Sequence, residues 1–437
     1  MPFFLLRLLV FSQNGLSLDQ APPIIVIFRF FFLGSLFGML AGILLFFYQT
    51  DIFDASTTAA LTFTHVLTLG VMLSFMFAAL FQMLPVIAGI ALDSPLQKSN
   101  ALLYPFATGV VMLLLGFNFP QSTWLYSLSS LLLGISLLSI VSLMLKKLLT
   151  LENHSASSKG MSVSLLALGF TVLLALYLLG TLTGYISGTY YTQIKTAHYS
   201  FGLFGWVSLL ILSISFQTIE MFYVTPPYPK IVSRYLPLGI LVLLVLSTVT
   251  ALFIPSTWVF TEVLLAVLLS GYALLSLKRL TQRKRPLTDA TVWFWRIGLS
   301  SLVLSMLSLF TLNFTELPIL KPLSYIFFSS FALSIVFAMF YKIIPFLTWF
   351  HLNSQGYFTA PMMHEVIHPK TAKKHLYIHV ATIVTFVLSL FGAPLIFLAA
   401  TLTIFSFGWM SYQIIHAHLL YKKTQETGKK FDMGSMG

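Results

Sequence analysis

The sequence predicts a polytopic α-helical membrane protein, and three observations support that prediction. Hydrophobic residues make up 58% of the 437 residues and charged residues only 8%, whereas a soluble globular domain carries about 25% charged residues. Apolar runs of the length needed to cross the hydrocarbon core, about 20 residues, recur from residue 24 to residue 421. These runs are continuous rather than alternating, which favours helices over a closed β-barrel in lipid.

The runs divide into twelve predicted spans, separated by tight uncharged turns or by polar loops. We place the spans at 24–48, 58–90, 100–118, 123–146, 161–185, 195–224, 232–253, 256–277, 290–313, 321–350, 375–393 and 395–421. They form a single membrane domain with an arm at 1–23, a cytoplasmic loop at 351–374 and a cytoplasmic tail at 422–437. The arm lacks a signal-peptide cleavage pattern, so we interpret it as cytoplasmic or interfacial.

Basic residues concentrate in the loops that follow even-numbered spans. They are Lys98, Lys146, Lys147, Lys159, Lys230, Arg234, Lys278, Arg279, Arg283, Lys284, Arg285, Lys370, Lys373 and Lys374, and the tail adds Lys422, Lys423, Lys429 and Lys430. The loops after odd-numbered spans hold only Lys195 and Lys321, beside three acidic residues. This asymmetry predicts cytoplasmic N- and C-termini in a bacterial inner membrane.

The net charge of +12 is explained by the same asymmetry and predicts no nucleic-acid partner. The expected partner is the lipid bilayer, and other membrane subunits are candidates. The chain contains no cysteine, which excludes disulfides, iron–sulfur clusters and thiolate zinc sites.

Spans 58–90, 195–224 and 321–350 share a pattern. Each is unusually long and opens with a polar ring residue, namely His65, His198 or Tyr325. These residues are 133 and 127 positions apart, so each repeat would hold four helices. The pattern predicts a pseudo-three-fold arrangement with repeats at about 24–146, 161–277 and 290–421. The alternative is that long helices rich in Phe and Leu resemble one another by composition alone.

His65 and His198 lie inside their spans near the predicted outer face. Ionisable residues within a membrane are candidates for function. Two neutral imidazoles on facing helices can act as axial ligands to a haem or bind copper, and Tyr325 would line the same pocket. The alternative is a pair of histidines whose nitrogens are satisfied by hydroxyl or backbone groups.

This arrangement resembles the catalytic subunit of the heme-copper oxidases, a family of twelve helices in three four-helix arcs. In that family the second helix carries a haem-ligating histidine followed by a Pro-x-x-x-Gly-like exit. His65 with Pro85-Val-Ile-Ala-Gly89 matches that pattern. His198 occupies a place comparable to the copper-ligating histidine of the sixth helix. The resemblance implies b-type haem, with copper as a further candidate.

Two departures from the family change what the resemblance implies. Span 321–350 has Tyr325 and no histidine in place of the paired haem ligands of the tenth helix, and the two adjacent copper ligands have no counterpart at 254–258. The resemblance therefore implies a divergent relative without a complete oxygen-reducing centre and without assigned catalytic residues. The chain is similar to the NnrS family of haem- and copper-containing membrane proteins linked to nitric-oxide stress. Any activity would be that of an oxidoreductase.

A second candidate site lies in the predicted cytoplasmic loop. His364-Glu365-Val366-Ile367-His368 reads as HExxH, in which two histidines one helical turn apart bind zinc and the glutamate activates a water. Pro369 follows directly and would stop the helix, so zinc is a less favoured cofactor than haem or copper here.

Two further function classes stay open from sequence. A transporter or channel would use the polar residues within the spans, such as Glu220, Glu262 and Lys342. A membrane subunit of a respiratory or transport complex would need no cofactor at all.

Overall fold

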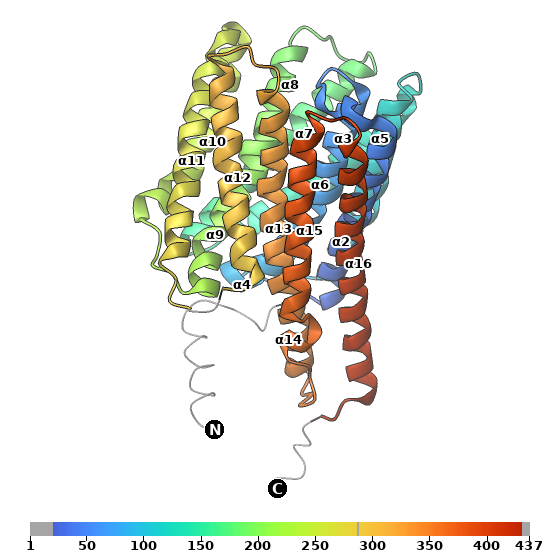
Figure 1. Ribbon diagram of the computed structural model, residues 1–437, viewed down its shortest axis with the longest axis vertical. Coiled ribbons are helices and arrows are strands. Elements are labelled where there is room, and N and C mark those ends of the chain that lie inside the picture. Colours follow the sequence, from blue (N-terminus) through green and yellow to red (C-terminus); the bar gives the residue numbers. More distant parts are fainter. Residues whose placement is uncertain (1–20, 286–287, 431–437) are drawn as a thin grey trace.

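The computed structural model describes residues 21–285 and 288–430, and the regular structure of this part of the chain is helical (Figure 1). β pairing is confined there to an isolated bridge between Tyr357 and Lys430. Most of the predicted arm and the last residues of the predicted tail lie outside the described residues. Eleven of the described helices are long and apolar enough to cross a membrane, which confirms a polytopic helical protein.

Nine of these eleven are built around one α-helix each. They are α2 (Ile24–Tyr48), α5 (Pro95–Asn118), α6 (Thr123–Leu149), α7 (Ala156–Leu182), α10 (Lys230–Phe253), α11 (Trp258–Thr281), α12 (Ala290–Leu312), α13 (Leu320–Ser354) and α16 (Leu395–Thr427). Short 3₁₀ turns follow α2 at Gln49–Phe53 (η1) and precede α11 at Pro255–Thr257 (η4). The bounds match the predicted spans to within a turn or two, because the length of each apolar run sets the length of its helix.

The second and sixth crossings are composite. The second consists of α3 (Thr58–His65), a π-helical segment η2 (Val66–Leu73) and α4 (Ser74–Ala88). The sixth consists of α8 (Tyr191–Ser200), a π-helical segment η3 (Phe201–Val207) and α9 (Ser208–Tyr223).

The predicted eleventh span, 375–393, is a helix but is not one of the eleven apolar crossings. The chain forms a short helix α14 (Met363–Val366) and then α15 (Pro369–Ser389). α15 begins six residues before the predicted span and includes three lysines in its first turns, which lowers its hydropathy. It lies alongside α13 and α16 (Figure 1).

The second and sixth crossings form the centre of the bundle. In their most apolar windows 89% and 78% of residues are buried, against 33% to 56% in the other nine crossings. α2 packs against α4 and also against α16, so the first and last described helices close the bundle. Because successive helices alternate in direction, the start of α2 and the end of α16 lie at the same end of the bundle (Figure 1). We call this end the basic end.

The predicted Pro-x-x-x-Gly exit has a clear structural role. Pro85 lies within α4, and Gly89 ends that helix with a φ of +68°. The Gly89 N–H donates to the Pro85 carbonyl at 3.1 Å, and the Ile90 N–H donates to the Leu84 carbonyl at 3.1 Å. This left-handed cap needs glycine, since a Cβ would disfavour the positive φ.

Candidate metal centre

His65 and His198 are 133 residues apart in sequence and come together in the structure. Their ring centroids are 6.3 Å apart, and their planes differ by only 11°. His65 is the last residue of α3 and His198 lies in α8, and both helices are at the end of the bundle opposite the basic end (Figure 1). The sequence prediction that these two helices present their histidines at a common level agrees with this geometry.

Backbone carbonyls fix the tautomer of both imidazoles. His65 Nδ1 lies 2.8 Å from the Leu61 carbonyl oxygen, one turn earlier in the same helix. His198 Nδ1 lies 3.0 Å from the Thr171 carbonyl oxygen of α7. A carbonyl oxygen only accepts, so each Nδ1 carries the proton and each Nε2 keeps its lone pair. Neither Nε2 has a hydrogen-bond partner within residues 21–285 and 288–430. This is the usual arrangement of a metal-ligating histidine.

The surroundings of the pair are largely apolar. The ring of Phe117, from α5, lies 4.9 Å from the ring of His65. A Cβ on Gly202 would lie at an ordinary contact distance, 3.5 Å, from the methyl group of Thr171, and α7 packs beside η3 here. Both histidines are half-buried.

In the second and sixth crossings, the α-helical geometry ends shortly after the histidine. The π-helical segment η2 begins at the residue after His65, and η3 begins three residues after His198. π-helical turns are rare and are concentrated at functional sites. Sequence reasoning missed this feature, because no local residue pattern distinguishes it from a continuous apolar helix.

Tyr325 neighbours Tyr199, the residue that follows His198. It lies near the start of α13, is 45% exposed and makes no described ring contact with His65 or His198. Its electrostatic neighbours are Tyr199 and Glu262. Tyr325 therefore lies near the histidine-bearing sixth crossing, where its neighbour is the residue that follows His198.

The HExxH motif does not form one helix. α14 ends at Val366, and Ile367 is extended with φ −134° and ψ 112°. Glu365 caps α14 by accepting from the Met362 N–H at 2.7 Å, and His368 Nδ1 caps α15 by accepting from the Lys370 N–H at 3.1 Å. The two histidines therefore do not share the helical face that the zinc motif requires.

Two other histidines of the same region, His375 and His379, are buried in α15. His375 Nδ1 lies 2.9 Å from the Tyr341 hydroxyl and its Nε2 lies 2.7 Å from Ser406 Oγ. His379 Nε2 lies 2.7 Å from Ser334 Oγ. These bonds join α15 to α13 and α16. The sequence pattern around these two histidines does not indicate their burial.

The polar residues considered for a transport path have separate local partners. Glu220 accepts from the Tyr228 N–H at 2.9 Å. Lys342 Nζ donates to Asp289 Oδ2 at 2.6 Å, so it is ion-paired rather than directed to the membrane surface alone. Glu262 interacts with Asn313.

The histidine pair offers a metal two neutral nitrogen ligands. Imidazoles that bind one metal from two sides, each with a nitrogen about 2 Å from the ion, have ring centres about 6 Å apart. The two observed rings are stacked with their centres 6.3 Å apart. Within residues 21–285 and 288–430 no group of three His, Asp or Glu residues is arranged to hold a metal. No protein-family model matches the chain, and no curated protein matches it.

Proposed function

We propose that this chain is a haem-binding membrane protein in which His65 and His198 are the axial ligands of a b-type haem. The observation that carries the proposal is the geometry of the pair: parallel imidazoles 6.3 Å apart, each with Nδ1 bonded to a carbonyl and Nε2 without a hydrogen-bond partner in the described structure. An Nδ1–H held by a carbonyl, with Nε2 left for a metal, is the usual arrangement of a ligating histidine.

The number of protein ligands favours haem over a bare copper ion. The pair supplies two ligands, and no third His, Asp or Glu is grouped with it among the described residues. A haem iron takes four further nitrogens from its porphyrin and needs only axial ligands from the protein. Copper bound by imidazole usually takes additional donors, so copper is the second cofactor to test. When bound, the haem would supply one-electron redox chemistry.

The protein's own residues would orient the ligands and protect the site. The Leu61 and Thr171 carbonyls keep the Nδ1 protons in place and raise the basicity of the opposite nitrogens. Phe117 covers one side of His65. The low polarity of the bundle would set the potential of the bound iron.

The wider proposal is a divergent relative of the heme-copper oxidase subunit, similar to the NnrS family, with its three repeats around a common axis. It is supported by the matching composite construction of the second and sixth crossings, each with a histidine before a π-helical segment. α13, the third member, is a continuous α-helix with Tyr325 in place of a histidine. We therefore propose a role in respiration-linked or nitric-oxide stress at the bacterial inner membrane, without oxygen reduction.

An absorption spectrum of the detergent-purified protein, with and without dithionite, tests the haem. We expect a Soret band and reduced α and β bands typical of two imidazole ligands, and His65→Ala and His198→Ala should each abolish them or convert the spectrum to a one-ligand form. His364→Ala, at the opposite end of the bundle, is the matched control and should leave the spectrum unchanged. A colourless preparation after haem supplementation, or haem that survives both substitutions, would contradict the proposal. Copper found instead, and lost in the same two variants, would replace haem by copper.

A further inference from the structure

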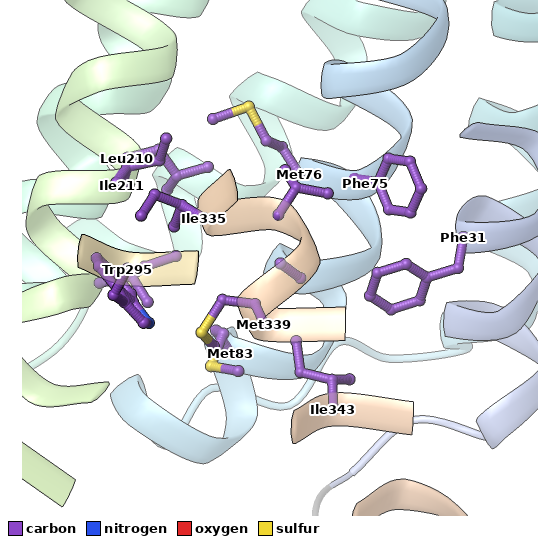
Figure 2. Close-up of a pocket in the computed structure, with 13 residues that line it drawn as sticks. Phe31, Phe75, Met76, Met83, Leu210, Ile211, Trp295, Ile335, Met339 and Ile343 are labelled. Atoms are coloured by element: carbon purple, nitrogen blue, oxygen red, sulfur yellow. The ribbon is translucent and has the colours of Figure 1, made fainter. Parts of the chain in front are cut away.

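The centre of the bundle holds a partly open space of about 50 Å³. All but two of its lining residues come from α4, α9 and α13, and the exceptions are Phe31 of α2 and Trp295 of α12. Figure 2 shows the side chains of Met76, Met83 and Met339 around it, together with aromatic rings. The cavity therefore lies where the three long spans that share a sequence pattern meet.

The lining gives this cavity an apolar character. Its side chains are hydrocarbon, thioether or aromatic, and the one side-chain N–H among them is Trp295 Nε1. That N–H is buried and interacts with the Tyr223 hydroxyl. A buried water needs about 10–15 Å³ and two to four polar partners. The space is large enough for water but lacks the partners, so we expect it to be dry.

A dry apolar cavity binds ligands that lose little hydration free energy when they leave water. Methionine sulfur and aromatic carbon are polarizable, and they favour a ligand that can make dispersion contacts on all sides. A charged or hydrogen-bonding ligand would lose its hydration without compensation. Small apolar molecules dissolve in the hydrocarbon core that surrounds these helices, so the lipid side would supply them.

We propose that this central cavity is a binding site for a small uncharged apolar molecule of the size of dioxygen or a xenon atom. The site is distinct from the histidine pair. Phe75, the first lining residue of α4, is ten residues after His65, which corresponds to about 15 Å along a helix. The proposal therefore does not depend on haem binding.

Xenon binding to the detergent-solubilised protein, followed by ¹²⁹Xe NMR over a pressure series, tests the site. We expect a saturable shift beyond that of empty micelles. Ala79, which lines the cavity, can be replaced by Leu to fill it, and Ala79→Leu should weaken saturable binding at least tenfold. Ala101→Leu makes the same change at an exposed position of α5 and should bind as the wild type does. A shift that never saturates, or one that Ala79→Leu leaves unchanged, would overturn the proposal.

A cavity-enlarging variant keeps the test decisive if Ala79→Leu is not recovered as a folded, monodisperse protein. Met339→Ala removes a lining side chain, and cavities of about 150 Å³ lined by apolar groups bind benzene. We expect Met339→Ala to be stabilised against thermal unfolding by benzene at a concentration that has no effect on the wild type. If benzene stabilises neither protein, or stabilises both equally, the cavity is not the binding site.

Discussion

Two pairs of histidines differ in which ring nitrogens are free. In the pair His65 and His198 each Nδ1 is bonded to a carbonyl and each Nε2 lacks a partner in the described structure. His375, in contrast, uses both nitrogens in bonds to Tyr341 and Ser406. An imidazole with both nitrogens hydrogen-bonded has no lone pair left for a metal. Histidine is therefore a candidate metal ligand in the pair His65 and His198, and a structural link between helices in the pair His375 and His379.

His375→Ala should destabilise the protein by about 2 to 4 kcal/mol, because it leaves the Tyr341 hydroxyl and Ser406 Oγ without their partner in a buried site. Chemical unfolding in detergent, followed by tryptophan fluorescence, measures the change. Any haem spectrum of the folded fraction should stay as in the wild type. His416→Ala, at an exposed position of α16, is the control and should change stability by less than about 0.5 kcal/mol.

Asp289 gives a prediction about acid sensitivity. Burial raises the pKa of this carboxyl, but the Lys342 ammonium together with hydrogen bonds from Lys342, Thr291 and the Val292 N–H outweighs burial, and the net pKa lies below the ordinary value of 3.8. A lowered folded-state pKa stabilises the protein above the unfolded value, and this contribution is lost as pH falls from about 4 through the folded pKa.

Asp289→Asn should therefore reduce the dependence of the thermal midpoint on pH below about 4. Asparagine still caps α12 by accepting from the Val292 N–H, so the helix start is retained. The loss at neutral pH should be small, about 0.5 kcal/mol, because the Asp289 side chain is 43% exposed. If the wild type and the variant lost stability in parallel from pH 7 to pH 3, another carboxyl would be responsible for the acid sensitivity.

Helix α2 meets α16 through small residues. A Cβ on Gly38 would collide with the ring of Phe407, and one on Gly42 would lie 2.6 Å from Ile404 Cγ1. Phe407 is itself buried, so the ring has little room to move. The close approach of the first and last described helices therefore depends on glycine in α2.

Gly38→Ala should destabilise the protein by about 1 to 3 kcal/mol, since over-packing outweighs the gain in helix propensity. Gly408→Ala is a matched control on α16, because its Cβ would lie at an ordinary contact distance, 3.6 Å from Met39 Sδ. That variant should be neutral or slightly stabilised. Unfolding midpoints measured in the same detergent compare the two, and equal losses would show that the effect is not specific to Gly38.

The crossings were predictable from sequence and the π-helical segments were not. Apolar run length depends on the bilayer, so it sets helix bounds with little influence from the rest of the chain. A π-helical turn requires one residue more per turn at a particular place, and tertiary contacts decide that place. The HExxH motif failed as a helix for a local reason, since Pro369 starts a new helix at N1 with His368 as its cap.

The candidate site was predictable only in part. His65 and His198 stand out because ionisable residues are rare inside spans, and the structure brings them together. Their carbonyl partners could not be predicted, because Thr171 belongs to another crossing whose rotation depends on packing. Tyr325 was expected to line the same pocket from its position in the repeat pattern. Its described neighbours are Tyr199 and Glu262, and its place in that pocket stays a prediction.

At the scale of the whole molecule, the crossings separate two chemically different ends. The histidine pair lies at one end, and the HExxH segment with α14 lies at the other, the basic end (Figure 1). Since α15 is less apolar than the other long helices, whether it crosses the membrane decides on which side the described C-terminal residues emerge. The positive-inside distribution predicts that it crosses and that the basic end is cytoplasmic.

The absence of cysteine allows this topology to be tested with single introduced thiols. We expect a membrane-impermeant maleimide to label Ala55→Cys, between α2 and α3, in intact cells, and to label Asn153→Cys, between α6 and α7, only after permeabilisation. Both positions are exposed, so accessibility within the protein does not limit labelling. Ala393→Cys, between α15 and α16, should be labelled in intact cells because α15 returns the chain to the outer face. The cysteine-free parent is the control for background. Labelling of Ala393→Cys only after permeabilisation would show that α15 does not cross, and labelling of Asn153→Cys in intact cells would invert the orientation and place the histidine pair toward the cytoplasm.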